Sequence, residues 1–443
     1  MTARRIAVVG SGIAGLGAAR LLTPHAQVTL FEAGDHFGGH AHTVDVKLDG
    51  HTHGVDTGFL VFNHRTYPLL RRFFDELGVD TAPSDMSFSV QSRRDGLEWS
   101  GSSLATVFAQ KRNLLRPAFL RMLAEIVRFN KLATGIAERN AETELSEDIG
   151  AFLDRHGFDQ VFREWYFLPM IGCIWSCPTD QMLRFPVATM IRFCHNHGLI
   201  QVSDRPQWYT VRGGSRNYVA RVIAGLHDAR LRLPVRAVRR GPDGVTVHTD
   251  HGSERFDELV LACHTDQSLA LLQDPSDAER DVLGAIRYQA NRTVLHTDTA
   301  LLPTRRRAWA AWNYEHVPGD PRQASVCLHY LIDRLQPLPF RTPVVVSLNP
   351  SREPSPAKVI DEWPVDHPVF DLAAIRAQQQ LPSLQGRRNT WYAGAWTRYG
   401  FHEDGLMSAH AVADAMIARW RLEAAGVGTV GTQAGLEHEA AVA

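Results

Sequence analysis

Three glycines near the amino terminus constrain the possible fold more than any other feature of the sequence. Arg5–Val9 is a short run rich in β-branched and apolar residues, which predicts a strand buried on both faces. Gly10, Gly12 and Gly15 follow, and the small and apolar residues Ile13–Leu22 predict a helix. In this pattern the first glycine permits a tight turn, the second lets a pyrophosphate approach the backbone, and the third lets helix and strand pack closely. The motif therefore predicts that dinucleotide phosphates bind at the helix N-terminus, where free N–H groups favour negative charge.

A second predicted strand, Gln27–Phe31, supports this interpretation because it ends at an acid, Glu32. The acid lies about 20 residues after the glycines, the spacing at which a carboxylate accepts a hydrogen bond from a ribose hydroxyl. Strand, glycine turn, helix, strand and acid in this order predict a Rossmann-like α/β domain. Its first predicted cofactor contacts are Gly10, Gly12, Ile13, Ala14, Gly15, Glu32 and Ala33.

Composition excludes several classes of function. The 443 residues contain 47 basic and 48 acidic side chains, a net charge of -1 that offers no overall field for nucleic acid or an anionic membrane. Five cysteines in so long a chain do not form a disulfide framework, and no apolar run is long enough to cross a bilayer. The basic, apolar start resembles a secretory signal, but the regular glycines argue against one. We therefore expect a cytoplasmic protein without a transmembrane segment and without a nucleic-acid partner, and peripheral membrane contact stays open.

Two downstream segments indicate which dinucleotide binds. Residues 33–42 (AGDHFGGHAH) place a second glycine pair after Glu32, and residues 54–62 (GVDTGFLVF) follow. With the first motif they resemble the flavoprotein superfamily of amine oxidases, protoporphyrinogen oxidase and phytoene desaturases. The resemblance implies FAD, with Gly39, Gly58 and Phe59 beside it. Relatives usually carry arginine after the glycine pair, next to the cofactor phosphates, whereas this chain has His40.

The stretch GFHEDG (residues 400–405) lies between a predicted strand, NTWYAGAW, and a predicted long helix, with Asp404 as a helix cap. In the superfamily this strand–loop–helix closes over the flavin, and N–H groups at the helix start stabilise charge on the reduced ring. The resemblance implies contacts from Gly394, Ala395, Asp404, Gly405 and Leu406, and a Val235 backbone contact to the adenine. Where relatives carry an acid after the alanine-glycine pair, this chain has Ala395-Trp396. No cysteine lies near this motif, so the FAD is predicted to be non-covalent.

The predicted chemistry depends on a departure from the amine oxidases. These relatives commonly place a lysine on a strand under the flavin, but the matching segment here, RYQANRTVLHTD, has Asn291 and Arg292 and no lysine. The chain most resembles a bacterial amine-oxidase-like subgroup often encoded beside cyclopropane-fatty-acyl synthases, which implies a lipid acyl substrate. We predict an FAD-dependent oxidoreductase that removes hydride from, desaturates or isomerises an unsaturated or cyclopropyl fatty-acyl lipid. An amine oxidase and a non-catalytic flavin-binding partner of a lipid-modifying enzyme are the alternatives.

Candidate reacting residues follow from the same motif. His402 is the candidate catalytic residue, because an imidazole can move a proton near neutral pH, and Glu403 could orient it. The alternative is a histidine that is only hydrogen-bonded at the helix entrance. Phe401 on one side, and Phe62 and Asn63 on the other, are the predicted walls of the substrate site.

A metal site is not predicted. Five histidines gather near the start of the chain, but their spacing does not suit ligands on one helix face, and the flavin motif accounts for the region. They are His36, His40, His42, His51 and His53. Cys173 and Cys177 form a single CxxxC without a second pair, and we interpret them as buried thiols.

The remaining pattern predicts two interleaved domains. Residues 1–75, 205–290 and 385–426 are assigned to the FAD-binding domain. Residues 76–204 and 291–384 form an α+β substrate domain with a mixed sheet and a helical insert, and residues 427–443 a disordered tail. Within the insert, residues 114–140 predict a helix with an apolar face that includes Val127, and Ser146 is a predicted cap. The aromatic segment 162–178 is interpreted either as helical core or as the wall of an apolar cavity.

Overall fold

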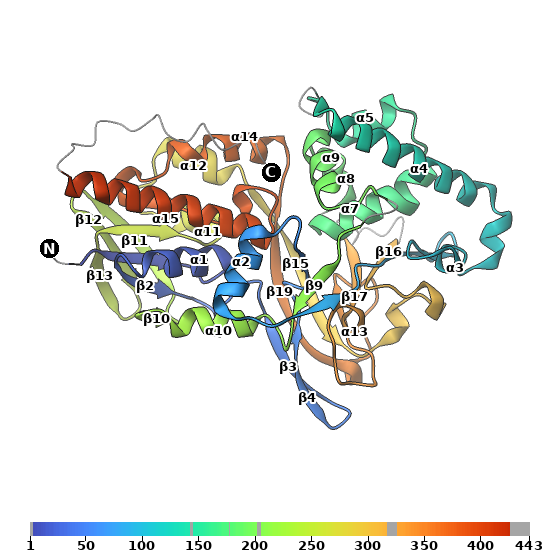
Figure 1. Ribbon diagram of the computed structural model, residues 1–443, viewed down its shortest axis with the longest axis horizontal. Coiled ribbons are helices and arrows are strands. Elements are labelled where there is room, and N and C mark those ends of the chain that lie inside the picture. The colour runs from blue at the N-terminus through green and yellow to red at the C-terminus, as the bar shows by residue number, and fades with distance from the viewer. Residues whose placement is uncertain (1–2, 142–144, 177, 202–204, 317–325, 426–443) are drawn as a thin grey trace.

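The computed structural model describes residues 3–141, 145–176, 178–201, 205–316 and 326–425. Figure 1 shows two lobes: one carries α1, α10, α15 and strands β10–β13, and the other carries helices α4–α9 above a large sheet. The segment 427–443, predicted to be disordered, lies outside the described residues. The predicted α/β class is confirmed, while the predicted domain boundaries stay predictions.

The first lobe is built on a five-stranded parallel sheet with the order β10-β2-β1-β14-β20. Apart from Arg5 and Gln27, which are exposed, the residues of its three central strands are buried and mostly apolar, as expected for a sheet covered on both faces. Helices α1, α10 and α15 and the antiparallel sheet β11-β12-β13 complete the lobe. The strands are β1 (Arg5–Val9), β2 (Gln27–Phe31), β10 (Asp228–Arg230), β11 (Val235–Gly241), β12 (Gly244–Thr249), β13 (Gly252–Phe256), β14 (Glu258–Leu261) and β20 (Thr390–Tyr392). The helices are α1 (Ile13–Leu22), α10 (Arg216–Ala224), α11 (Thr265–Leu271), α12 (Asp277–Gly284), α14 (Leu372–Gln380) and α15 (His402–Ala424).

The first and last helices of this lobe lie side by side (Figure 1). A Cβ at Gly17 would lie 2.9 Å from the Leu406 side chain and 3.0 Å from that of Ala409, so α1 and α15 approach closely through small residues. At their N-terminal ends, a Cβ at Gly405 would lie 2.6 Å from Ile13 Cγ2. The N-termini of α1 and α15 therefore lie next to each other at the carboxyl ends of the parallel strands.

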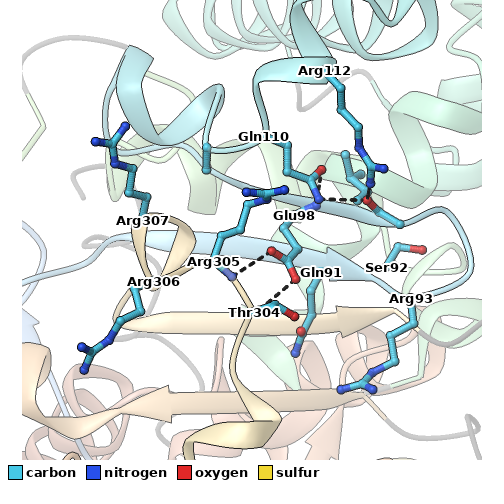
Figure 2. Close-up of a pocket in the computed structure, with 13 residues that line it drawn as sticks. Gln91, Ser92, Arg93, Glu98, Gln110, Arg112, Thr304, Arg305, Arg306 and Arg307 are labelled. Atoms are coloured by element: carbon cyan, nitrogen blue, oxygen red, sulfur yellow. Dashed lines mark hydrogen bonds between the residues drawn. The ribbon is translucent and has the colours of Figure 1, made fainter.

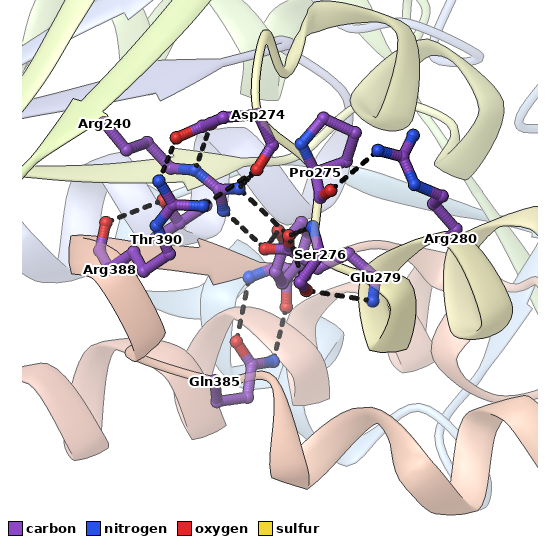
Figure 3. A network of polar contacts seen from close by, with 10 residues as sticks. Arg240, Asp274, Pro275, Ser276, Glu279, Arg280, Gln385, Arg388 and Thr390 are labelled. Carbon is purple, nitrogen blue, oxygen red and sulfur yellow. Dashed lines mark hydrogen bonds and ion pairs between the residues drawn. The ribbon is translucent and has the colours of Figure 1, made fainter.

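A polar network fixes the last strand of the parallel sheet (Figure 3). The fully buried guanidinium of Arg240 on β11 pairs with Glu279 on α12 and with Asp274, and the hydroxyl of Tyr392 on β20 donates to Glu279 at 2.6 Å. Burial opposes ionisation of Glu279, but the Arg240 and Tyr392 hydrogen bonds outweigh it and lower its pKa to about 2. Gln385 donates to the Tyr392 carbonyl and accepts from its N–H. The network holds β20, and thus the loop that follows it, in a fixed position.

The second lobe contains a seven-stranded mixed sheet with the order β19-β15-β18-β17-β16-β7-β8. One face packs against the helices, through residues such as Leu295, Tyr314, Leu328 and Val346. The strands are β7 (Phe88–Ser92), β8 (Leu97–Ser100), β15 (Arg287–His296), β16 (Trp312–His316), β17 (Cys327–Leu331), β18 (Val345–Leu348) and β19 (Val359–Val369). The helices are α4 (Pro117–Glu138), α5 (Ile149–Arg155), α6 (Gln160–Phe162), α7 (Leu168–Trp175), α8 (Thr179–Met182) and α9 (Val187–Asn196), with the short α13 (Ile332–Leu335) after β17.

Smaller elements join the lobes: the hairpin β3 (Thr43–Leu48) and β4 (His51–Asp56), helix α2 (Pro68–Leu77), and the sheet β5-β9-β6. The last comprises β5 (Phe62–Asn63), β6 (Thr81–Ser84) and β9 (Trp208–Val211).

The helix predicted within residues 114–140 is confirmed as α4, but its start, the burial of Val127 and the predicted cap of α5 are wrong. The helix predicted over residues 114–140 begins at Pro117, and its Val127 is 62% exposed rather than part of the buried face. Asp148, not Ser146, caps α5, because its carboxylate accepts a hydrogen bond from the Ala151 N–H at 2.8 Å. The aromatic residues of segment 162–175 lie in the helical core, as the first of the two interpretations expected; Cys173 is buried there, and Cys177 lies outside the described residues.

Candidate active site

The glycine turn leaves space where a cofactor phosphate is expected. A Cβ at Gly10 would lie 2.9 Å from the Ala262 carbonyl oxygen, and one at Gly15 would lie 1.9 Å from the Gly10 carbonyl oxygen, so packing requires both glycines. A Cβ at Gly12 would meet nothing within 4 Å. Gly12 is also the N-cap of α1 and makes no side-chain cap bond, so the first N–H groups of the helix face open space. This space fits the pyrophosphate of a dinucleotide.

The acid predicted to bind a ribose organises the loops beside this space. Glu32 accepts a hydrogen bond from the Ser11 N–H at 3.0 Å through one oxygen and from the Gly34 N–H at 2.7 Å through the other. The Ser11 hydroxyl in turn accepts from the Gly38 N–H at 3.0 Å. A Cβ at Gly39 would lie 3.1 Å from Gly12 Cα, so the second glycine pair lies directly against the first motif. Ser11 is a connecting residue that sequence reasoning missed, and Ala33 is exposed nearby.

The structure also brings together His40, Gly58, Phe59 and His402. A Cβ at Gly58 would lie 2.1 Å from the His40 carbonyl oxygen, which also accepts from the Phe59 N–H at 2.8 Å. The Phe59 ring stacks on the His402 imidazole, with centroids 3.7 Å apart and planes at 18°. The hydroxyl of Tyr218, on α10, lies 3.1 Å from His402 Nε2. No local motif indicated Tyr218, because its contact joins residues far apart in the sequence.

The acids of GFHEDG act as helix caps. Asp404 accepts from the Phe401 N–H at 2.9 Å, so it caps α15 from the third helical position rather than from the cap position itself. Glu403 accepts from the Leu69 and Leu70 N–H groups, both at 2.9 Å, at the start of α2. The prediction that Glu403 orients His402 is therefore wrong, because its carboxylate binds another helix.

Burial sets the protonation states of this segment. It raises the pKa of the Asp404 carboxyl to about 7, and it lowers the pKa of His402 to about 3 with a smaller contribution from His40. The His402 imidazole is therefore neutral over the pH range from 6 to 9. The expectation that it titrates near neutral pH is not supported.

Three further histidines form a neutral row beside this segment. The His40 ring centroid lies 5.6 Å from that of His367 on β19 and 6.1 Å from that of His264, which follows β14. Burial lowers the pKa of His40 to about 4 and that of His367 to about 3, and it lowers that of His264. His40 Nε2 is buried without a hydrogen-bond partner among the described residues, as expected where a ligand atom completes the site.

Strand β15, which was predicted to lie under the flavin, places an amide side chain beside these histidines. Asn291 on β15 is buried, and its Nδ2 lies 2.9 Å from His367 Nδ1. Arg292 points away and forms ion pairs with Glu353 and Glu362 at the surface. Sequence reasoning found Asn291 but missed its histidine partner, which belongs to a distant strand.

The predicted substrate walls have different surroundings. The Phe401 ring stacks on Phe193 of α9 with centroids 5.0 Å apart, and Phe193 lies 5.0 Å from Trp175 of α7, so aromatic rings connect the start of α15 to the helical lobe. Phe62 is instead fully buried against Phe74. Asn63 is also fully buried, and its side-chain carbonyl accepts hydrogen bonds from the backbone N–H groups of Arg65 and Thr66. Both side chains are packed or hydrogen-bonded within the protein interior. The prediction that they form the wall of the substrate site opposite Phe401 is therefore wrong in this structure.

A hydrogen bond to α15 holds the loop that follows β20. The Gly394 N–H donates to the Ser408 hydroxyl on α15 at 2.9 Å, and Ala395 is half-buried beside it. The Trp396 indole lies against Gly394, and its buried Nε1 has no partner among the described residues. Val235 is buried at the start of β11, in one apolar cluster with Val9 and Phe31.

One group of side chains in the described residues has the composition of a metal site. Glu315, Cys327 and His329 are fully buried on adjacent strands, with donor atoms within 4.8 Å of one another. Hydrogen bonds to neighbours satisfy them: Arg93 donates to Glu315 at 2.7 Å, and His329 Nδ1 lies 2.7 Å from the Ser347 hydroxyl. These contacts account for the group without an ion.

Comparisons with known proteins identify the family. The family model described as flavin containing amine oxidoreductase matches residues 13–337. The chain is 27% identical to AofH of Mycobacterium tuberculosis, named as a flavin-containing monoamine oxidase, over 61% of this chain and 59% of that protein. It is 30% identical to the carotenoid phi-ring synthase of Streptomyces griseus, over 58% of this chain and 52% of that protein. The chain thus spans between half and three fifths of the length of these curated relatives.

Solved structures show the same fold. The fatty acid isomerase of P. acnes, described as producing CLA, aligns with a TM-score of 0.66 and 18% identity over 94% of this chain and 98% of that one. Cyclohexylamine oxidase from Brevibacterium oxydans aligns with a TM-score of 0.67 and 15% identity over 95% and 100%. The chain belongs to the flavin-containing amine oxidoreductase family, and its implied cofactor is a flavin. No helix in the described part of the chain has both the length and the apolarity to span a membrane.

Proposed function

We propose that this protein binds FAD non-covalently and is an oxidoreductase that acts on an apolar substrate, an unsaturated or cyclopropyl fatty-acyl lipid. The open space at Gly12 would hold the pyrophosphate, and Glu32 would bind the adenosine ribose. The N-terminus of α15 would face the flavin ring, whose chemistry is the acceptance of a hydride. Among the remaining predicted contacts, Gly39 lies against Gly12, Phe59 stacks on His402, and Gly394 is bonded to Ser408 on α15, whereas Val235 lies on β11.

The main observation that supports an apolar substrate is that the three histidines and Asn291 in this row carry no charge at neutral pH. The histidines are uncharged at neutral pH, Asn291 replaces the expected lysine, and the nearby carboxylates of Glu403 and Asp404 bind backbone N–H groups. A polyamine bound here would lose its hydration, which is costly for a cation, and neither Glu403 nor Asp404 would offer it a free carboxylate. An acyl chain against the aromatic rings of Phe401 and Phe193 carries no such cost. The names of the fatty acid isomerase and the carotenoid phi-ring synthase agree with this substrate class.

In this proposal His402 acts as a neutral group. Its stacking on Phe59 and its contact with the Tyr218 hydroxyl hold the imidazole in one orientation, so it positions the cofactor or substrate and excludes water. The Asn291–His367 pair would contribute a hydrogen bond at the flavin edge without adding charge. Without a lysine at Asn291, proton transfer would depend on the substrate and on neutral imidazoles.

Anaerobic mixing of the purified, flavin-loaded protein with candidate substrates tests the proposal. We expect unsaturated or cyclopropyl acyl lipids to bleach the flavin absorption faster than putrescine or cyclohexylamine, or to be isomerised without net bleaching. Faster bleaching by the amines would instead support an amine oxidase, the alternative favoured by the names of AofH and the cyclohexylamine oxidase. Bound flavin that reacts with neither class would support a non-catalytic partner of a lipid-modifying enzyme.

Acid precipitation tests the attachment of the cofactor. We expect FAD to remain in the supernatant, because no cysteine lies near the loop after β20. Yellow colour retained in the pellet would refute non-covalent binding. The predicted cytoplasmic location belongs to the same proposal, and fractionation of producing cells would test it.

A further inference from the structure

A surface far from the parallel sheet combines unpaired cations with exposed leucines. It consists of α3 (Leu104–Val107), the 3-10 helix η1 (Lys111–Leu115) and the 3-10 helix η5 (Arg306–Ala308), which we call the tip surface. Leu104 is 80% exposed, Leu114 50% and Leu115 88%. Exposing several leucine side chains together on one surface is energetically unfavourable in water, and such a surface often marks an interaction site.

The cations surround a pocket of about 730 Å³ (Figure 2). Arg112 from η1 and the consecutive Arg305, Arg306 and Arg307 line it, and all four are exposed. Arg112 donates only to a backbone carbonyl, and Arg305, Arg306 and Arg307 form no ion pair among the described residues. With the adjacent Lys111, five positive charges lie on a protein whose net charge is -1.

The acid in this pocket does not neutralise the arginines. Glu98 accepts hydrogen bonds from the backbone N–H groups of Thr304 at 2.9 Å and Arg305 at 3.0 Å (Figure 2). Its carboxylate therefore holds the arginine loop against β8 and leaves the guanidinium groups directed outward. The Arg306 guanidinium lies 4.9 Å from the Trp309 ring centroid, which keeps it extended. The hydrogen bonds to Glu98 therefore fix the backbone of the loop that carries three of the five cations.

We propose that the tip surface docks on an anionic phospholipid membrane, with lipid phosphates in the arginine pocket and Leu104, Leu114 and Leu115 in the apolar layer. Guanidinium groups bind phosphate oxygens in a bidentate manner. Exposed leucines next to cations are the combination that binds at a lipid interface. A nucleic acid would use the cations but not the leucines, and no aromatic side chain lines the pocket for base stacking.

This orientation connects the surface to the proposed chemistry. The η1 segment of the tip surface leads directly into α4, whose Phe119 and Met122 are buried in the core of the helical lobe while Leu120 is 43% exposed. Docking would place the lobe that carries Phe193 beside the membrane where acyl chains reside. The docking proposal does not depend on the reaction, because binding to vesicles is measured without turnover.

Sedimentation with vesicles tests the docking. We expect the flavin-loaded protein to bind vesicles that contain phosphatidylglycerol, to bind pure phosphatidylcholine much more weakly, and to dissociate as salt is raised. Replacing Arg305, Arg306 and Arg307 together by Gln should weaken binding by about 100-fold, from roughly five-fold for each cation. The double variant Leu114→Ser/Leu115→Ser should weaken binding while retaining its salt dependence.

A matched control removes three exposed arginines that lie outside the tip surface, by Arg71→Gln, Arg236→Gln and Arg255→Gln. This variant changes the net charge equally and should bind vesicles like the unmodified protein. Equal loss in both triple variants would overturn the proposal, since binding would then depend on net charge alone. Binding to double-stranded DNA or to an acidic protein without binding to anionic vesicles would also overturn it.

Discussion

Replacing Gly12 by Ala separates cofactor binding from folding. The new methyl group would meet no atom of the protein within 4 Å, and the backbone at Gly12 has φ -62°, which alanine adopts without strain. Alanine is a poorer N-cap than glycine by about 1 kcal/mol, and the smaller entropy of the unfolded chain offsets much of this. We therefore expect the free energy of unfolding of the flavin-free protein to change by less than about 1 kcal/mol.

The same methyl group occupies the space proposed for the pyrophosphate. We expect FAD affinity to fall at least 100-fold, which corresponds to about 2.7 kcal/mol. Gly15→Ala is the contrasting variant, because its Cβ would lie 1.9 Å from the Gly10 carbonyl oxygen and should destabilise the flavin-free protein by about 1–3 kcal/mol or more. Urea unfolding of the flavin-free proteins and titration with FAD followed by flavin fluorescence measure both quantities. Unchanged FAD affinity in Gly12→Ala would refute the placement of the pyrophosphate.

Three further predictions follow from buried charges. Glu279→Gln leaves the buried Arg240 guanidinium with only Asp274, and should lower the free energy of unfolding in urea by about 3 kcal/mol. Asp250→Asn, in the exposed pair with Arg236, should lower it by less than about 1 kcal/mol. Equal effects would contradict the role of burial. The folded protein holds a proton on Asp404 up to a pKa of about 7, above the unfolded value near 4, so Asp404 adds at most about 4 kcal/mol of stability to the flavin-free protein as pH falls from 7 to 4. The buried histidines act in the opposite direction, because burial lowers the pKa of His40 to about 4 and those of His367 and His402 to about 3, below the unfolded value. Asp404→Asn should therefore lose more stability than the unmodified protein over this pH range, and an equal loss in both proteins would contradict the raised pKa of Asp404. His402→Gln should retain the pH profile of flavin reduction between pH 6 and 9, because the pKa of His402 is about 3, and loss of a titration step in that range would show that His402 ionises during turnover.

The sequence predicted best those elements whose cause is local. β1, α1 and β2 have the predicted ends, because two continuous buried strands, three glycines and a terminal acid leave one arrangement for a short strand–helix–strand unit. The predicted cap of α5, Ser146, is wrong, because Asp148 two residues later is the cap. The structure selects Asp148 because its backbone pairs with that of Pro186, a contact no local pattern contains.

Long-range contacts explain what the sequence did not predict at the candidate site. Glu403 follows His402 directly, yet successive helical residues point in different directions, and Glu403 reaches α2 instead. Tyr218, His264 and His367 belong to three separate elements that meet only in the folded protein. Phe62 and Asn63 are close in sequence to Phe59, but their strand pairs with β9 and turns both side chains into the interior.

The pairing of α1 with α15 has a consequence for synthesis of the protein. The glycine turn leaves the ribosome early, but Gly405, which packs against its helix, belongs to the last described helix. β20 and α15 are also the final elements added to the parallel sheet and its cover. A nascent chain therefore lacks one side of the proposed flavin site until α15 has been translated. We accordingly expect FAD to bind only after this helix has formed, and truncation before residue 402 should abolish binding although the first motif is intact.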